Sequence, residues 1–109
     1  MKLHKLIEIS LAAHDIETLK KAHFLAGIVF VDSGNPSEAI QHYKHLRNIV
    51  ESYGENNLKF HIYTEMGLCY QQMKEYKKAI RAFKKLLEVA WKTNNKQEET
   101  KAFDYIGIQ

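Results

Sequence analysis

Three glycines recur at a spacing of forty residues, at Gly27, Gly67 and Gly107. Glycine inside a helix costs about 1 kcal/mol relative to alanine, so a regularly repeated glycine indicates a packing requirement. A fixed period of this length is typical of helical units that stack on one another and bury a continuous core. The spacing therefore predicts an all-α stack of helix pairs, and it constrains the fold more than any local motif does.

The composition suits helices packed around a core. Of the 109 residues, 45% are hydrophobic and 27% are charged, and the net charge of +3 permits an acidic partner without requiring one. The single cysteine excludes an intrachain disulfide and favours a reducing compartment. No apolar run approaches the roughly 18 residues of a membrane span. We expect a cytoplasmic protein that does not enter the membrane.

The apolar spacing indicates helices over nearly the whole chain. The clearest break is Gly34 followed by Pro36, because glycine ends helices and proline fits a first helical turn. The segment from Ala22 to Val31 is apolar almost all round, so we expect its helix to be buried on several sides. The expected helices cover approximately residues 1–13, 16–32, 36–52, 58–72, 76–92 and 97–109.

A shift of forty residues also aligns the neighbours of the glycines. We expect the small residues to let two helix backbones approach closely, and the aromatic residues three positions after each glycine to fill the space beside that contact. The aligned pairs are His23 with Tyr63, Ala26 with Met66, Phe30 with Tyr70, Ala39 with Ala79, Ile40 with Ile80, Tyr43 with Phe83 and Leu46 with Leu86.

The copy from Tyr63 to Phe83 resembles the tetratricopeptide repeat, in which an aromatic residue, Leu-Gly and a second aromatic residue precede Ala-x3-Phe. The copy that starts at His23 matches more loosely, the closing proline is absent, and the period is 40 rather than 34 residues. The longer period is similar to that of repeats in spindle-orientation scaffolds and kinesin light chains. The resemblance implies a right-handed stack of antiparallel helical hairpins, about five helices in all, that acts as a non-catalytic protein–protein interaction scaffold.

We interpret residues 1–109 as one repeat domain. Residues 1–14 would be the second helix of a preceding repeat, 15–53 the first repeat, 55–93 the second, and 96–109 the start of a third. Apolar faces would then be exposed at both ends of the stack. We therefore expect a fragment of a longer repeat protein. The alternative is a small protein that self-associates through the open ends.

The resemblance also implies a binding groove, because the first helix of each hairpin lines the concave surface of such stacks. An apolar ladder along it would suit a helix or a mixed peptide. Ile28 and Leu68 stand where the family's carboxylate clamps have asparagines, which argues against a clamp. The alternative is that a neighbouring segment covers the ladder. The implied groove residues are Lys21, Phe24, Ile28, Val31, His61, Thr64, Glu65, Leu68, Gln71, Lys101, Asp104 and Ile108.

A second candidate surface is the basic outer face of the helix that ends near Lys92. If Tyr76 and the other apolar residues of this helix face inward, a row of cations faces outward. This face is interpreted either as ordinary solvated surface or as a patch for acidic protein tails or nucleic acid in a cytoskeletal or ciliary assembly. Few aromatic residues interrupt it, so we do not expect nucleic acid. The residues are Lys77, Arg81, Lys84 and Lys85.

The sequence holds no motif typical of catalysis. His42 and His45 are three residues apart, but no second ligand cluster accompanies them at a recognisable spacing. His23 takes an aromatic position of the repeat, so packing explains it. Cys69 lies between Leu68 and Tyr70, where a buried apolar role is expected. We expect no enzyme activity, no metal and no cofactor.

Overall fold

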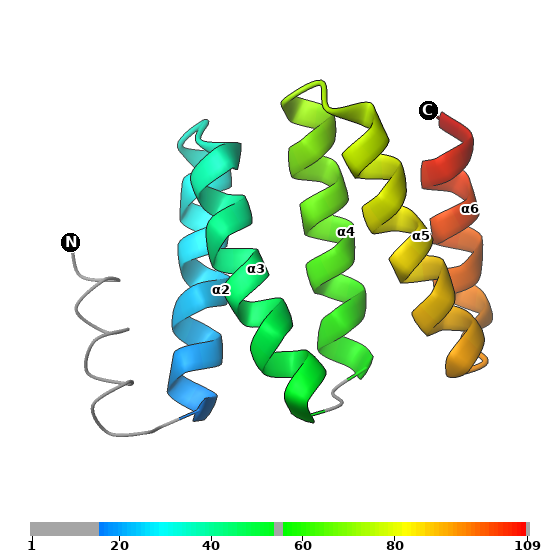
Figure 1. The fold of residues 1–109 in the computed structure, drawn as a ribbon, viewed down its shortest axis with the longest axis horizontal. Coiled ribbons are helices and arrows are strands. Elements are labelled where there is room, and N and C mark those ends of the chain that lie inside the picture. Colours follow the sequence, from blue (N-terminus) through cyan, green and yellow to red (C-terminus); the bar gives the residue numbers. More distant parts are fainter. Residues whose placement is uncertain (1–15, 54–55, 109) are drawn as a thin grey trace.

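The computed structural model describes residues 16–53 and 56–108, and every regular element in these two ranges is an α-helix (Figure 1). The helix expected over residues 1–13 lies outside the described residues. The bounds of two described helices coincide with the expected 16–32 and 76–92, and those of the other three differ by one or two residues. The helices are α2 (Ile16–Asp32), α3 (Pro36–Tyr53), α4 (Asn56–Gln72), α5 (Tyr76–Lys92) and α6 (Lys96–Ile108).

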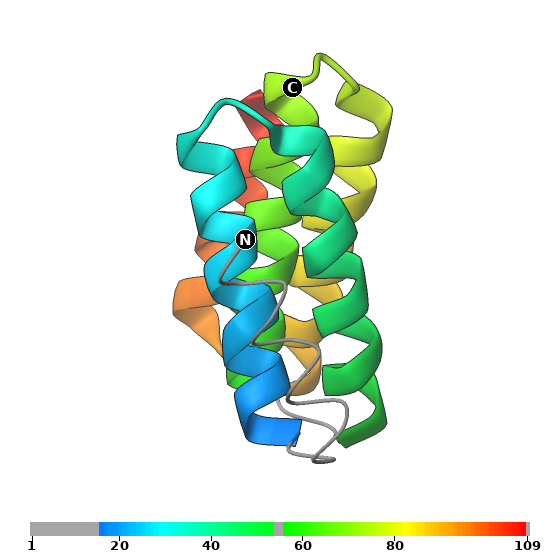
Figure 2. The ribbon, with the colours of Figure 1, turned by 90° about the vertical axis from the view of Figure 1, so that its left-hand side faces the viewer.

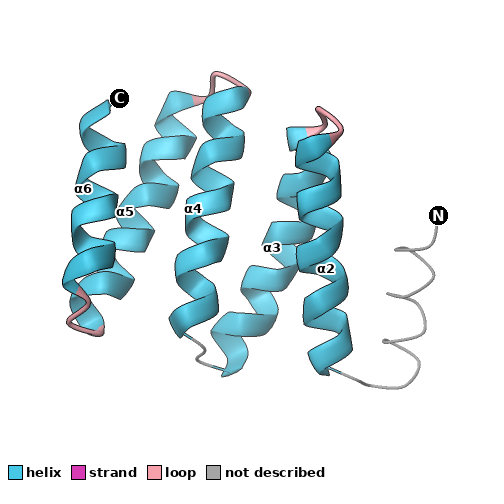
Figure 3. Cartoon of the chain, turned by 180° about the vertical axis from the view of Figure 1, so that it is seen from behind, coloured by secondary structure: helices cyan, strands magenta, loops and turns pink. Residues whose placement is uncertain are grey.

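Each helix packs against the next one in the chain, so the molecule is built from successive antiparallel neighbours. The helices alternate between two layers. Figure 3 shows α2, α4 and α6 side by side in the nearer layer, and the side view in Figure 2 places α3 and α5 together on the other side. This two-layer arrangement confirms the all-α stack of helical pairs that the glycine period predicts.

Three helices end in a left-handed residue: Gly34 has a φ of 77°, Lys74 61° and Asn94 54°. At each of them, the backbone N–H of that residue donates to the carbonyl three positions earlier. The N–H of the next residue donates to the carbonyl five positions earlier. In the first turn, for example, the N–H of Asn35 donates to the carbonyl of Phe30, with an N···O distance of 2.7 Å. These paired bonds form Schellman motifs, which satisfy the terminal carbonyls and reverse the chain.

Gly27 and Gly67 are buried, whereas Gly107 is exposed, and the packing role of the two buried glycines differs from the one expected. A Cβ on Gly27 would lie 2.5 Å from Cζ of Tyr43, and a Cβ on Gly67 would lie 2.3 Å from Cε1 of Phe83. Each glycine therefore makes room for an aromatic ring of the following helix, sixteen residues later in the chain. The atoms nearest to each added Cβ belong to these rings of the following helix, and none belongs to Phe30 or Tyr70, the rings three positions after the glycines.

Two expectations about burial are also wrong. Along α2, Leu25 is 50% exposed and Val29 is 40% exposed, so the helix is not buried on several sides despite its apolar composition. On α5, Tyr76 is 52% exposed rather than inward-facing. An apolar residue at a helix end or on a helix's outer side is buried only where a neighbouring element covers it, and periodicity alone does not supply that information.

Candidate functional site

The predicted groove residues lie on α2, α4 and α6, which form one layer of the stack (Figure 3). Those whose side chains are described are all at least partly accessible. The most exposed of the apolar members is Ile28, at 40%. The side chain of Ile108 lies outside the described residues. The exposed members are Lys21, Ile28, His61, Lys101 and Asp104, and the half-buried members are Phe24, Val31, Thr64, Glu65, Leu68 and Gln71.

Phe24 links the predicted residues of the two repeats. Its ring centroid lies 6.4 Å from that of His61 on α4 and 6.3 Å from that of Tyr43 on α3, edge to face in the second case. Phe24, Val31 and Leu68 also pack against the hydrophobic core. The α2 and α4 residues thus form a surface that continues from one repeat to the next.

Glu65 lies within this surface, one helical turn after His61. Burial raises the pKa of its carboxyl, and the charge of His61 opposes that rise. The neighbouring Tyr43 has a buried hydroxyl with no hydrogen-bond partner among the described residues, and burial followed by the charge of Glu65 raises its pKa. A carboxyl group and a hydroxyl group therefore lie among the apolar side chains of this layer.

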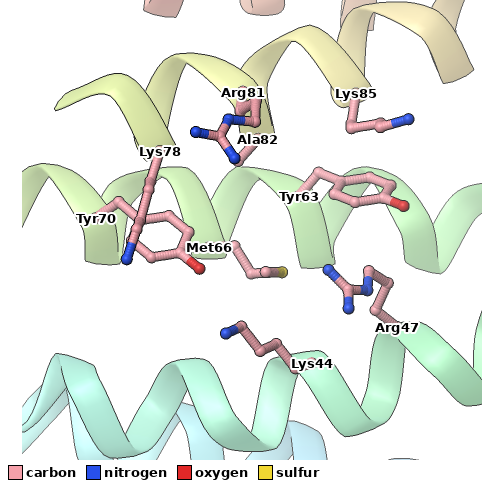
Figure 4. Close-up of a pocket in the computed structure, with 9 residues that line it drawn as sticks. All are labelled: Lys44, Arg47, Tyr63, Met66, Tyr70, Lys78, Arg81, Ala82 and Lys85. Carbon is pink, nitrogen blue, oxygen red and sulfur yellow. The ribbon is translucent and has the colours of Figure 1, made fainter. Parts of the chain in front are cut away.

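The opposite layer holds a cleft of about 300 Å³ between α3 and α5, with α4 as its floor (Figure 4). Cations reach it from both walls. Aromatic and thioether side chains of α4 form the floor. The lining residues are Lys44, Arg47, Tyr63, Met66, Tyr70, Lys78, Arg81, Ala82 and Lys85.

The cleft has two defined polar contacts on its floor. The Tyr63 hydroxyl donates to Oε1 of Glu51 over 2.7 Å, and Nζ of Lys78 lies 5.9 Å from the centre of the Tyr70 ring. The bond from Tyr63 lowers the pKa of Glu51, as do the charges of Lys59 and Arg47, while burial opposes them. The two tyrosine rings are therefore held in place against the inner wall of the cleft.

Only part of the predicted basic face lines this cleft. Arg81 and Lys85 line the cleft, whereas Lys77 and Lys84 lie outside its lining. Lys44 and Arg47 were missed, because the prediction considered a single helix. The repeat itself could have found them: equivalent second helices lie side by side in a stack, so the cations of one wall face those of the next.

Three histidines that are separate in the sequence meet between α2 and α3. Nδ1 of His23 lies 3.1 Å from Nδ1 of His42, and the ring of His45 stacks on His23 at 5.4 Å. Burial and then the charges of His42 and His45 lower the pKa of His23 to about 4. Phe30 stacks on His42 at 5.5 Å, so His23 and His42 have a packing role. Within the described part of the chain, no cluster of three or more potential metal ligands occurs.

A two-layer stack of hairpins with a regular glycine–aromatic interlock defines a helical repeat protein. The family model of the tetratricopeptide repeat matches residues 17–90, more than half of the chain. The chain belongs to the tetratricopeptide repeat family. Among curated proteins, none matches it. No helix in the two described ranges has the length and apolar character needed to cross a membrane.

Proposed function

We propose that this chain is a non-catalytic scaffold that binds a peptide or helix of a partner protein across the layer of α2, α4 and α6. Tetratricopeptide repeats generally mediate protein–protein interaction. The observation that carries the proposal is the contact of Phe24 with His61, because it joins two first helices into one accessible surface. The same layer is the one that the family resemblance implies as the concave face.

The chemistry of this surface favours an amphipathic partner. Ile28 is exposed and Leu68 is half-buried, so both can bury further apolar area on binding. Polar groups of His61, Thr64 and Gln71 lie on the same helix layer and can take the polar edge of a bound segment. Helices that dock in grooves use this combination of apolar anchors and polar margins. The buried Cys69 agrees with a cytoplasmic scaffold, and a cytoskeletal or ciliary association stays a prediction.

The test is selection of peptides from a random library on the whole chain, followed by affinity measurements with variants. We expect Ile28→Asp and Leu68→Asp each to weaken the selected peptides at least about tenfold, the equivalent of about 1.4 kcal/mol. The matched control is Lys77→Asp, which changes an exposed residue of the other layer. Equal affinities of the parent and both groove variants would contradict the proposal. A pull-down with the complete protein, with and without these changes, applies the same comparison to natural partners.

A second candidate function is binding of an acidic protein tail or nucleic acid by the cations of α3 and α5, on the layer opposite to the groove. It is favoured by the position of Arg81 and Lys85, which lie in the cleft together with cations of α3. Salt distinguishes the two candidates, because binding through several cations weakens steeply as salt rises, whereas apolar docking does not.

A further inference from the structure

The cleft between α3 and α5 combines features that no single helix provides (Figure 4). We propose that it binds an acidic segment of a protein partner, in which carboxylate side chains flank an apolar side chain. This inference concerns the layer opposite to Ile28 and Leu68. It rests on the second candidate function, for which it names the site and the ligand, and it is independent of the function proposed for the layer of α2, α4 and α6.

The first argument is the convergence of positive charge. Lys44 and Arg47 approach the cleft from α3, and Lys78, Arg81 and Lys85 approach it from α5 (Figure 4). Like charges that face one another across a narrow opening repel, and a bound anion removes that repulsion. Cations from two different repeats therefore favour a ligand that carries more than one negative charge.

The second argument is the incomplete pairing of these cations. Lys78 pairs with Glu75 and Lys85 with Glu88, each at 3.5 Å and within its own helix. Among the described residues, Lys44, Arg47 and Arg81 make no ion pair within 4 Å. Both arginines can offer a planar pair of N–H donors, which matches the geometry of a carboxylate.

The third argument is the apolar floor. Met66 is only 3% exposed and Ala82 is also buried, so buried apolar groups form the base of the cleft. The volume of about 300 Å³ is at the lower end for ligand sites and suits one or two side chains rather than a folded domain. An apolar side chain can enter here while neighbouring carboxylates reach the cations at the rim.

The same floor argues against nucleic acid. Proteins that bind single strands stack bases on accessible aromatic faces. Tyr63 and Tyr70 are 6% and 9% exposed, so neither ring offers such a face.

The test uses the whole chain and three labelled probes in fluorescence anisotropy. The first is a synthetic peptide with glutamates on both sides of a leucine, the second replaces every glutamate with glutamine, and the third is a single-stranded oligonucleotide of the same charge as the first. We expect the glutamate peptide to bind at low salt, to weaken as salt rises, and to bind at least about tenfold more tightly than either other probe. Preference for the oligonucleotide, or no binding of the glutamate peptide, would overturn the proposal.

Matched variants locate the site. The double change Arg47→Glu with Arg81→Glu reverses two lining charges, and Lys77→Glu with Lys84→Glu reverses two exposed charges outside the lining. We expect at least a tenfold loss of glutamate-peptide affinity for the first pair and less than a threefold loss for the second. Equal losses would show that net charge alone attracts the peptide and would overturn the site.

Two further measurements keep the test decisive. Arg47→Gln with Arg81→Gln removes the charges without reversing them, and circular dichroism melts show whether each variant is folded. Ile28→Asp changes the opposite layer, so it should leave glutamate-peptide affinity within twofold of the parent. A loss in this variant as large as in the arginine variants would place the peptide elsewhere and overturn the proposal.

Discussion

The Tyr43 ring lies directly over Gly27, so closely that a Cβ on the glycine would be 2.5 Å from the ring carbon Cζ. Forty residues later, Phe83 lies over Gly67 in the same way. Both rings are fully buried. Gly27 and Gly67 therefore each leave space for an aromatic ring, and the two described hairpins, α2–α3 and α4–α5, each close around one such contact.

Replacement of Gly27 by alanine tests this recess. We expect Gly27→Ala to lower the free energy of unfolding by about 1–3 kcal/mol, because the added methyl overlaps the buried Tyr43 ring. Gly107 is the matched control, since a Cβ there meets no atom within 4 Å among the described residues. Gly107→Ala should be neutral or raise the free energy of unfolding by up to about 1 kcal/mol, through helix propensity. Urea denaturation measures both, and equal effects would contradict the expectation.

The buried hydroxyl of Tyr43 predicts a stabilising substitution. This hydroxyl has no hydrogen-bond partner among the described residues, and the equivalent position of the next repeat is Phe83. Tyr43→Phe should raise the free energy of unfolding by about 1 kcal/mol, because a buried polar group without a partner costs about 1–3 kcal/mol. Tyr63→Phe should lower it, since the Tyr63 hydroxyl donates to Glu51. A thermal melt in which both variants lose stability would contradict this account.

The left-handed backbone at Lys74 predicts a second stabilising substitution. Lys74 has a φ of 61°, where a Cβ is strained and glycine is favoured. We expect Lys74→Gly to raise the free energy of unfolding by about 0.5–1 kcal/mol, after allowance for the greater freedom of glycine in the unfolded chain. Lys84→Gly, at an exposed position in the middle of α5, should instead lower it by about 1 kcal/mol. A destabilised Lys74→Gly variant would show that the turn does not need this conformation.

Stability should fall as the pH falls below neutrality, in part through His23. Its folded pKa is about 4, whereas a histidine in the unfolded chain titrates near 6.5, so the unfolded state takes up a proton first. The contribution of His23 is present above pH 6.5 and is lost between about pH 6.5 and 4, with a slope of up to about 1.4 kcal/mol per pH unit.

The variant His23→Tyr, which carries the residue of the equivalent position in the next repeat, isolates this contribution. Denaturation curves across the same pH range should show a smaller slope for the variant than for the parent. Carboxylates contribute to both slopes, so the difference between them is the informative quantity. Identical slopes would contradict the proposed role of the buried His23–His42 pair.

The sequence predicts the helices well because residues that end or begin helices stand at clear positions. Gly34 and Pro36 mark the end of α2 and the start of α3, and the apolar period supplies the rest. Lys74 is a weak turn signal by itself, and its alignment with Gly34 is what identifies it. The ring that covers Gly67 could not be identified in the same way, because spacing within one helix does not determine which side chain of the next helix meets it.

The candidate surfaces were less predictable than the fold. The family resemblance places the groove residues on α2, α4 and α6, and nothing in the pattern indicates that Leu25 and Val29 remain exposed. The basic cleft depends on the distance between α3 and α5, which only the stacked structure defines. Lys44 and Arg47 line the cleft because α3 and α5 face each other across α4, which the repeat implies but the pattern of a single helix does not.

The most direct test of the stacked architecture is a double-mutant cycle between Gly67 and Phe83, measured by urea denaturation. Leucine lacks the ring atom Cζ that would lie 2.5 Å from a Cβ at position 67. In the Phe83→Leu background, Gly67→Ala should therefore cost at least about 1 kcal/mol less than it does in the parent. Costs that add to within about 0.5 kcal/mol would contradict the interlock of glycine and ring on which the repeat depends.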